Sequence, residues 1–297
     1  MTAMSDELVA LKYQIDQALN AALPSSSDIA QPIVDAMRHS VLGGGKRMRP
    51  MLACATAQAF NVARERAYPV ACAVEFIHAY SLIHDDLPAM DDDDLRHGLP
   101  SAHIKYGEAN AILAGDSLHS LAFQTIADSN SVSAETKLQM IQLLSTAAGW
   151  AGMAGGQCLD IEAEGKELSL SELQQLHAAK TGALFRVSIQ LGVLAAEEAS
   201  PTNEQYLLFT EFGDRLGLAF QVMDDVLDVT ASTEELGKPA GSDEAADKNT
   251  FPKLMGLEQA RSMAITLVEE ALALLKRTHL ETYLLEELAQ LVVSRKH

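Results

Sequence analysis

The chain has 297 residues, of which 48% are hydrophobic and only 5% aromatic, and its formal net charge is −19 at pH 7. This acidity argues against a nucleic-acid partner, because a basic surface supplies most of the affinity for nucleic acids. No stretch approaches the roughly 18 uninterrupted apolar residues of a membrane span, and Asp6 and Glu7 do not suit a basic signal-peptide start. We therefore expect a cytoplasmic protein without a membrane span.

The cysteines at positions 54, 72 and 158 are an odd, widely spaced set without a CxxC pair. They favour neither a disulfide framework nor a zinc site, so we interpret all three as small core residues. No linker rich in Pro, Gly or Ser divides the sequence. We expect a single domain that spans residues 1–297.

Apolar residues recur at helical spacing along almost the whole chain, and Ala and Leu dominate the long segments. The first three predicted helices run from Leu8 to Leu19, through Ile33 to Met37, and from Pro50 onward after a break at Gly43-Gly44-Gly45. Further helices are predicted from about Val70 to Leu87, Gly107 to Ala127, Ala134 to Ala154, Ser169 to Leu194, Asn203 to Val229, Leu257 to Lys276 and Tyr283 to Val293. Because no segment shows the sustained alternation of a strand, the predicted fold class is all-α.

The segment from Ala231 to Thr250 departs from the helical pattern, since Gly237, Pro239 and Gly241 lie among polar residues. Connections of this length are uncommon unless they are functional or disordered. We interpret this segment as a candidate lid.

Two aspartate-rich segments adjoin apolar sequence in different halves of the chain. They are Asp85-Asp86-Leu87-Pro88-Ala89-Met90-Asp91-Asp92-Asp93-Asp94 and Asp224-Asp225-Val226-Leu227-Asp228. Either one alone fits a solvated charged face. Crowded carboxylates repel one another, however, and hard cations relieve that repulsion. With basic residues in Gly44-Gly45-Lys46-Arg47-Met48-Arg49-Pro50 and at Arg96, the pair predicts a Mg²⁺ cage for a phosphorylated substrate.

Helix geometry supports this interpretation of the second segment. Asp224 and Asp228 are four residues apart, so both carboxylates project from one helix face. Gln221 precedes Asp224 or Asp225 by about one turn and lies on nearly the same stripe.

In the first segment, His78, Ser81 and Asp85 also share one helix face. Asp85 and Asp91 would not align on a straight helix, but Pro88 removes a backbone donor and should distort or end the helix. We expect this distortion to bring the two carboxylates together.

Several motifs in one chain resemble the trans-isoprenyl diphosphate synthases, and most closely those of the bacterial farnesyl diphosphate type. They are the two aspartate segments with Arg96, Phe220-Gln221 before the second segment, Gly45 to Pro50, Gly156-Gln157 and Lys180-Thr181-Gly182. The resemblance covers essentially the whole chain. It implies helices around a deep central cavity and, usually, a homodimer.

The resemblance further implies a Mg²⁺-dependent head-to-tail condensation of isopentenyl diphosphate with dimethylallyl or geranyl diphosphate, giving (2E,6E)-farnesyl diphosphate. The allylic C–O bond ionises, the isopentenyl double bond attacks, and a proton is lost to the departing diphosphate. The alternatives are a geranylgeranyl or geranyl diphosphate synthase, a class I terpene cyclase, and a regulatory subunit of a heteromeric synthase. The basic residues that suit a second diphosphate disfavour the cyclase, and the intact carboxylates disfavour the regulatory subunit.

Residue roles follow from the resemblance, position by position. Asp85, Asp91 and Asp224 resemble ligands of three Mg²⁺ ions, with Mn²⁺ as an alternative, and Asp86, Asp225 and Asp228 would support them or bind through water. Arg96, Lys180 and Lys238 resemble ligands of the allylic diphosphate, and Lys248 lies in the same candidate lid as Lys238. Lys46, Arg49, His78 and Arg295 resemble the isopentenyl diphosphate site. Thr181 and Gln221, with the Lys180 carbonyl, would face the developing cation, which oxygen atoms stabilise while metal and cationic side chains stabilise the leaving group.

The sequence departs from the family pattern at His97, because the family usually has a second arginine after Arg96. A permanently charged fork is thereby replaced by a ring that titrates near neutrality, which bears on isopentenyl diphosphate binding. Among the other histidines, we expect His84 and His103 to be structural and His119, His177 and His297 to lie on the surface.

Tyr80 is the candidate determinant of product length, with Ser81 beside it. Tyr80 precedes Asp85 by five residues, or about 7.5 Å of helix rise, so its ring suits the floor of a cavity for the growing chain. In the family, an aromatic residue here, together with the insertion Pro88-Ala89, goes with a C15 product. An ordinary core tyrosine is the alternative.

Overall fold

The computed structural model describes residues 4–230 and 249–294. These residues form helices α1 (Asp6–Ala22), α2 (Gln31–Leu42), α3 (Met48–Ala59), α4 (Tyr68–Asp85), α5 (Ala102–Tyr106), α6 (Glu108–Ala127), α7 (Ala134–Ala148), α8 (Met153–Glu162), α9 (Leu170–His177), α10 (Ala183–Ala195), α11 (Asn203–Thr230), α14 (Phe251–Met255), α15 (Leu257–Arg277) and α16 (Tyr283–Ser294). The strands β1 (Leu95–Arg96) and β2 (Leu99–Pro100) form a minimal antiparallel hairpin. The all-α fold class is confirmed.

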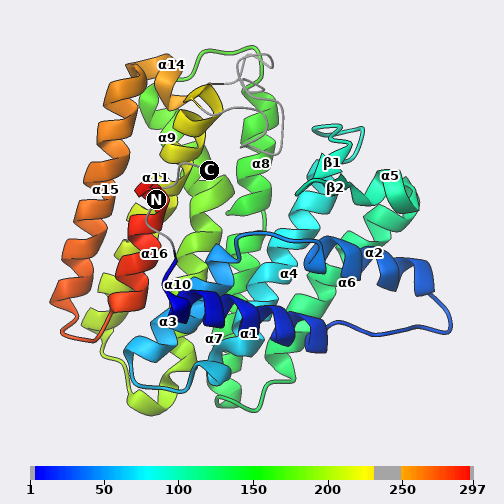
Figure 1. Cartoon of the computed structure of the whole chain (residues 1–297), viewed down its shortest axis with the longest axis horizontal. Coiled ribbons are helices and arrows are strands. Elements are labelled where there is room, and N and C mark those ends of the chain that lie inside the picture. The colour runs from blue at the N-terminus through cyan, green and yellow to red at the C-terminus, as the bar shows by residue number, and fades with distance from the viewer. Residues whose placement is uncertain (1–3, 231–248, 295–297) are drawn as a thin grey trace.

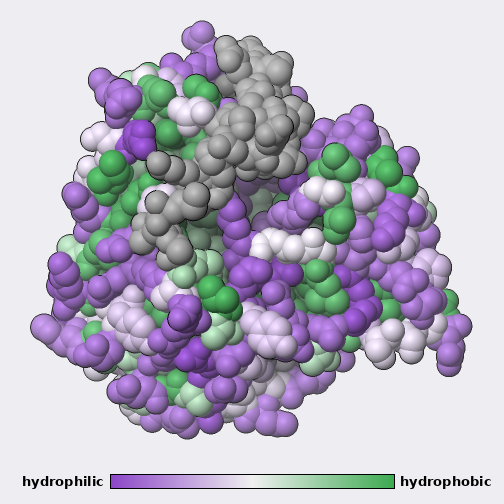
Figure 2. Space-filling view, viewed as in Figure 1, coloured by the Kyte–Doolittle hydropathy of each residue, from purple (hydrophilic) through white to green (hydrophobic). Residues whose placement is uncertain are grey.

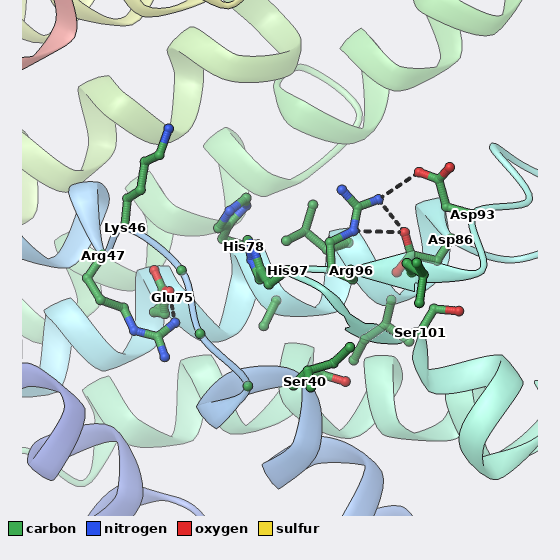
Figure 3. A pocket seen from close by; sticks show the side chains of 18 of the residues that line it. Ser40, Lys46, Arg47, Glu75, His78, Asp86, Asp93, Arg96, His97 and Ser101 are labelled. Atoms are coloured by element: carbon green, nitrogen blue, oxygen red, sulfur yellow. Dashed lines mark hydrogen bonds and ion pairs between the residues drawn. The ribbon is translucent and has the colours of Figure 1, made fainter. Parts of the chain in front are cut away.

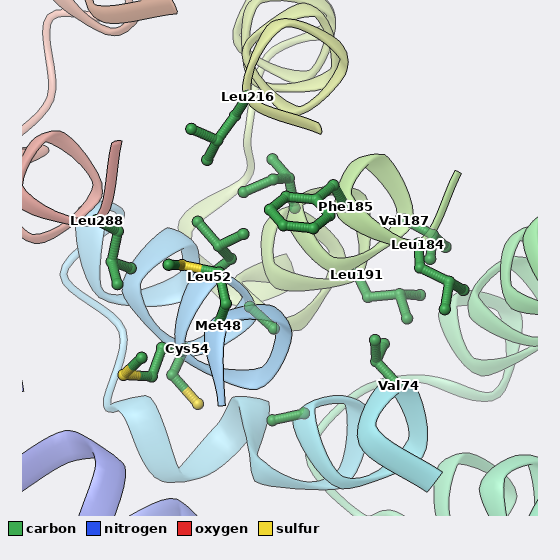
Figure 4. Close-up of a cluster of buried hydrophobic side chains, with 14 of the residues drawn as sticks. Met48, Leu52, Cys54, Val74, Leu184, Phe185, Val187, Leu191, Leu216 and Leu288 are labelled. Atoms are coloured by element: carbon green, nitrogen blue, oxygen red, sulfur yellow. The ribbon is translucent and has the colours of Figure 1, made fainter. Parts of the chain in front are cut away.

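The centre of the molecule is built from α3, α4, α10 and α11, which pack on one another in the order α4, α3, α10, α11. In Figure 1, α15 and α16 lie on one side of these helices and α2, α5 and α6 on the other. Figure 4 shows the core where Leu52, Phe185, Leu216 and Leu288 meet from four helices. Polar residues cover most of the face in Figure 2, with hydrophobic ones scattered among them.

Two predicted helices are interrupted, and both interruptions shape the site. The helix predicted from Ala134 to Ala154 ends at Ala148, and α8 starts at Met153 after a turn in which Trp150 is 90% exposed. The helix predicted from Ser169 to Leu194 contains a π-helical segment at residues 178–182 between α9 and α10. Such segments widen one helical turn and often occur at functional sites.

Two other expectations are corrected by burial. The cysteines at positions 54 and 72 are buried, as expected, but Cys158 is exposed. His177 lies in the interior rather than on the surface, with 8% of its area exposed and its ring stacked on Phe251 at 5.6 Å between centroids. No helix among the described residues is long and apolar enough to cross a membrane.

Candidate active site

Two cavities meet at α3 and α4. The first, of about 510 Å³, has polar walls that include the glycine-rich turn after α2, the β hairpin and α11. The second, of about 480 Å³, is mainly apolar and lies between α4, α8 and the π-helical segment. Arg49, His78 and Leu82 line both cavities. The arrangement offers a charged chamber that leads into an apolar one, which suits an amphiphilic substrate.

The first aspartate segment begins where α4 ends, as Pro88 predicted. The chain turns after Asp85, and the Asp91 amide donates to the Asp85 carbonyl at 2.8 Å. The distortion therefore brings these two residues together. Burial raises the pKa of Asp85 to about 6, and the negative charges of Asp91 and Asp86 add to that shift while Lys180 opposes it.

The second segment lies in the last turns of α11. Asp224 is partly exposed, whereas Asp225 and Asp228 are buried. Asp225 is held by two hydrogen bonds, because Gln221 Nε2 donates to Oδ1 at 3.1 Å and the Phe251 amide donates to Oδ2 at 3.0 Å.

Solvent access separates the carboxylates into two sets. The three expected to contact metal directly are Asp85, Asp91 and Asp224, and each has solvent-accessible area. The three expected to act in support are Asp86, Asp225 and Asp228, and each is buried.

The glycine-rich turn sends neighbouring basic side chains in opposite directions. Arg47 has left-handed backbone (φ 53°) and is only 6% exposed, with its guanidinium bonded to Asp16 at 2.8 Å, to Glu75 at 2.6 Å and to the Val41 carbonyl at 2.6 Å. Figure 3 shows Lys46 extending away from Arg47, which points back toward Glu75. Arg47 thus fixes the turn to α1, α2 and α4 and leaves Lys46 exposed at the polar cavity.

Arg49 and His78 lie where the two cavities join. The Arg49 guanidinium stands 5.0 Å over the Phe185 ring, and its buried Nε has no hydrogen-bond partner among the described residues. Burial lowers the pKa of Arg49, which the charges of Glu75 and Asp224 oppose. Burial and the nearby charge of Arg49 also hold the pKa of His78 well below its usual range. An anion placed here would satisfy a buried donor and offset concentrated positive charge.

The hairpin carries Arg96 and His97 to the opposite wall of the polar cavity. Arg96 is anchored by Asp86, with Nε 3.0 Å from Oδ1, and by Asp93 at 3.2 Å. His97 has positive φ (54°) and lies near His78 in Figure 3. Burial and the charges of Arg96, Arg47 and Lys46 lower the pKa of His97.

The residues expected to face the developing cation are also together. Thr181 Oγ1 donates to Gln221 Oε1 at 2.9 Å, and Gln221 Nε2 donates in turn to Asp225. The three side chains thus form one hydrogen-bond chain. Lys180 Nζ bonds Asp160 Oδ2 at 2.6 Å, and Asp85 lies near enough for Lys180 to lower its pKa.

The apolar cavity extends along α4 from Asp85 toward Tyr80 and Ser81, both of which line it. The Tyr80 ring meets His84 and His119 edge-on, at 5.7 Å and 5.0 Å between centroids. Lys238, Lys248, Arg295 and nearly all of the candidate lid lie outside the described residues, so their predicted roles remain expectations from the sequence.

Comparisons with known proteins agree with this geometry. A family model described as polyprenyl synthetase matches residues 30–289. Farnesyl diphosphate synthase from Escherichia coli is 46% identical over 294 residues, which are 97% of this chain and 98% of that protein. The chain belongs to the polyprenyl synthetase family.

Solved polyprenyl synthetase structures are similar over their full length. An FPP/GFPP synthase from Zymomonas mobilis has 37% identity and a TM-score of 0.86 over 98% of this chain and 100% of that one. A geranyltransferase from Helicobacter pylori, complexed with magnesium and isoprenyl diphosphate, has 33% identity and a TM-score of 0.84 over 98% of both chains.

The polyprenyl synthetase site of this chain contains residues that sequence reasoning missed. Asp160 was missed, and it holds the Lys180 side chain. Gly156 was named only as part of a motif, and its reason was missed: it lies one turn earlier on α8, where an added Cβ would lie 2.2 Å from the Lys180 backbone nitrogen. The spacing of Gly156 and Asp160 on one helix face could have indicated this support. Nothing in the sequence indicated that Arg47 turns inward to Glu75.

The donor set fits a hard divalent cation, although no three His, Cys, Asp or Glu side chains in residues 4–230 and 249–294 already converge to hold one. Asp85, Asp91 and Asp224 supply oxygen donors only, which is the chemistry that Mg²⁺ prefers. The raised pKa of Asp85 shows carboxylates that are crowded and partly desolvated. A bound cation would relieve that crowding.

Proposed function

We propose that this polyprenyl synthetase condenses isopentenyl diphosphate head to tail with dimethylallyl and then geranyl diphosphate, with farnesyl diphosphate as the product. The observation that carries the proposal is the pair of adjoining cavities, which share Arg49 and His78 and are lined between them by residues of both aspartate segments and by Lys180. The charged chamber suits two diphosphates and the apolar one suits a prenyl chain. The farnesyl diphosphate synthases among the relatives support the C15 product.

The chain's own residues have distinct tasks in this reaction. Asp85, Asp91 and Asp224 would hold Mg²⁺, and when bound the metal neutralises charge on the leaving diphosphate. Lys180 and Arg96 would bind the same diphosphate, as the family resemblance implies, and the ion pairs with Asp160 and Asp86 hold these two side chains in position. The bond that breaks is the allylic C–O bond, and its electron pair leaves with the diphosphate.

The carbon side of the reaction needs oxygen atoms and exclusion of water. Thr181 and Gln221 present polar atoms beside the apolar cavity. Their oxygen atoms can stabilise the developing positive charge. Isopentenyl diphosphate would bind between Lys46 and Arg49 on one wall and His97 on the other, with His78 beside Arg49. Its double bond forms the new C–C bond to the allylic carbon, and a proton is then lost to the departing diphosphate. No nucleophilic side chain is required.

We further propose that residues 1–297 act as one catalytic domain and that the partner is a second copy of this chain. The family resemblance implies a homodimer, and α6 leaves Ile112 and Leu113 exposed. Packing of a second copy would cover such apolar side chains.

Substitution of the two partly exposed aspartates tests the metal role. We expect Asp85→Ala and Asp224→Ala each to lower kcat by on the order of 10²-fold or more, because each loses charge stabilisation worth several kcal/mol in the transition state. Product formation from isopentenyl and dimethylallyl diphosphate with Mg²⁺ measures this loss, and circular dichroism checks the fold. Asp128→Ala, which removes an exposed carboxylate at the end of α6, is the control. Full activity in either site variant would disprove the metal role.

A further inference from the structure

Two separate segments form opposite walls of the polar cavity, and they pack closely against each other at one end. The glycine-rich turn, residues 43–45, faces the β hairpin: a Cβ added at Gly43 would lie 3.2 Å from Leu99 Cδ1, and one at Gly45 would lie 3.6 Å from His97 Nε2. The turn leads into Lys46 and Arg49, and the hairpin carries Arg96 and His97. The distance between these two pairs of side chains therefore depends on how the hairpin is held.

The hairpin is too short to be stable by itself. Each strand has two residues, with Leu95 opposite Pro100 and Arg96 opposite Leu99. His97 and Gly98 at its tip both have positive φ, as a tight two-residue turn requires. An isolated hairpin is at best marginally stable in water, and one this short must depend on contacts outside itself.

His39, near the end of α2, supplies such a contact. Its Nε2 lies 2.8 Å from the Pro100 carbonyl oxygen, and its Nδ1 lies 3.2 Å from Lys105 Nζ. The ring also meets the Tyr106 ring edge-on at 5.5 Å. His39 therefore joins α2, β2 and α5 through one side chain.

The chemistry of the two partners fixes the state of the imidazole. An ammonium group only donates, so Nδ1 of His39 must accept from Lys105. A carbonyl only accepts, so Nε2 must carry the proton that bonds Pro100. Both contacts require the same neutral tautomer, and they reinforce each other.

We propose that His39, held in this tautomer by Lys105, is a positioning residue that anchors the hairpin against the glycine-rich turn. It thereby sets the spacing between Lys46 and Arg49 on one wall and Arg96 and His97 of the hairpin on the other. The inference rests on the proposed function for its catalytic readout, because the ligand that spans the walls is isopentenyl diphosphate. His39 itself is not required to touch the reacting atoms.

Three variants of the full chain test the anchor. His39→Phe keeps a ring against Tyr106 but loses both hydrogen bonds, and Lys105→Met removes the ammonium donor. His39→Gln keeps one donor and one acceptor on a side chain of similar reach. Lys137→Met is the matched control, since Lys137 also donates one exposed hydrogen bond, to the Ala127 carbonyl at 3.0 Å, and lines neither cavity.

The Michaelis constants for isopentenyl and dimethylallyl diphosphate and kcat are measured with Mg²⁺. We expect His39→Phe to raise the constant for isopentenyl diphosphate about five- to tenfold, because two modest hydrogen bonds are lost. Lys105→Met should raise the same constant by about half as much on a logarithmic scale. His39→Gln should keep it close to the value of the unsubstituted protein, and the Lys137→Met control should leave it unchanged. The double variant His39→Phe/Lys105→Met should be no worse than His39→Phe, because both remove one shared contact.

Hydrogen exchange of the peptide covering residues 94–101 gives a readout that is independent of turnover. Faster exchange in His39→Phe, with α15 unchanged, supports the anchor. Unchanged exchange together with an unchanged Michaelis constant in His39→Phe would overturn it, as would equal losses in His39→Gln and His39→Phe. If the unsubstituted protein fails to join the two substrates, the proposed function is wrong. The hydrogen-exchange measurement still decides whether His39 holds the hairpin.

Discussion

At the scale of single residues, the amino-acid type predicts some roles, whereas the backbone conformation determines others. Lys46 and Arg47 are adjacent and equally basic in sequence, and both line the polar cavity, yet Lys46 is exposed there whereas Arg47 is buried. The left-handed backbone of Arg47 turns its side chain inward to Glu75, and that conformation is rare for residues other than glycine. The basic motif therefore could not by itself separate the residue that is exposed at the cavity from the one that fixes the turn.

His97 is the residue where this chain departs from the family pattern, and its charge can be tested through pH. In the protein without substrate, burial and neighbouring cations lower the pKa of His97. A bound diphosphate should raise that pKa, so binding takes up a proton. Affinity for isopentenyl diphosphate should then be highest below the pKa of the substrate-free state and should fall as pH rises through the higher pKa of the bound state.

The comparison with His97→Arg isolates this effect. The arginine stays charged, so we expect tighter binding by about 1–2 kcal/mol near neutral pH and a flatter pH profile of the Michaelis constant. The allylic substrate carries the same diphosphate group and serves as the control for ionisation of the substrates. Identical profiles in the two proteins would mean that His97 does not contact isopentenyl diphosphate.

At the scale of helices and strands, periodicity predicted the regular parts and missed the irregular ones. The helix predicted from Leu257 to Lys276 is observed as α15 (Leu257–Arg277), because its apolar stripe repeats without a break. The π-helical segment at residues 178–182 keeps almost the same stripe and so escaped notice, although it carries Lys180 and Thr181. The hairpin was missed for a different reason, since strands of two residues have no alternation to detect.

The length of α4 between Asp85 and Tyr80 should set the length of the product. The Tyr80 ring lines the apolar cavity and packs edge-on against His84 and His119, about 7.5 Å of helix rise from Asp85. Tyr80→Ala or Tyr80→Met should open this end and shift the product from C15 toward C20, as measured by chromatography of the dephosphorylated prenols. Tyr68→Ala, on the first turn of the same helix and outside both cavities, is the matched control. Coinciding product distributions for Tyr80→Ala and the unsubstituted protein would assign the floor to another residue.

For the molecule as a whole, a large negative net charge contrasts with a local cluster of cationic side chains in the polar cavity. The chain carries −19, which repels anions at a distance, yet Lys46, Arg49 and Arg96 gather around one cavity. Because the molecule repels anions overall, substrate binding depends on these few cations and on the metal that accompanies the diphosphate. Composition gave only the overall acidity, whereas the three-dimensional arrangement brings these cations together with carboxylates around one cavity.

Whole-molecule stability should fall in mild acid because of one buried histidine. Burial lowers the pKa of His177 to about 4, although Asp160 opposes the shift, and neither ring nitrogen has a hydrogen-bond partner among the described residues. In the unfolded chain the imidazole titrates near 6.5. Between those two values the unfolded state binds more protons than the folded state, so stability is retained above about pH 6.5 and lost as pH falls toward 4. At pH 5 the lowered pKa of His177 should reduce the free energy of unfolding by about 2 kcal/mol.

His177→Phe removes that titration while keeping an aromatic ring against Phe251, and it also removes two unpaired polar atoms. We expect the substituted protein to be at least as stable at pH 7 and to lose about 2 kcal/mol less of its unfolding free energy between pH 7 and pH 5. Urea denaturation at pH 7 and pH 5 measures the unfolding free energy of each protein. Subtracting the change in one protein from the change in the other cancels the titration of the carboxylates that both proteins share. His279→Asn is the control for loss of an exposed histidine, since asparagine tolerates the positive φ (57°) at that position. Equal acid sensitivity in His177→Phe and the unsubstituted protein would show that the imidazole is protonated in the folded state, and that the interior around Phe251 opens to water before the molecule unfolds.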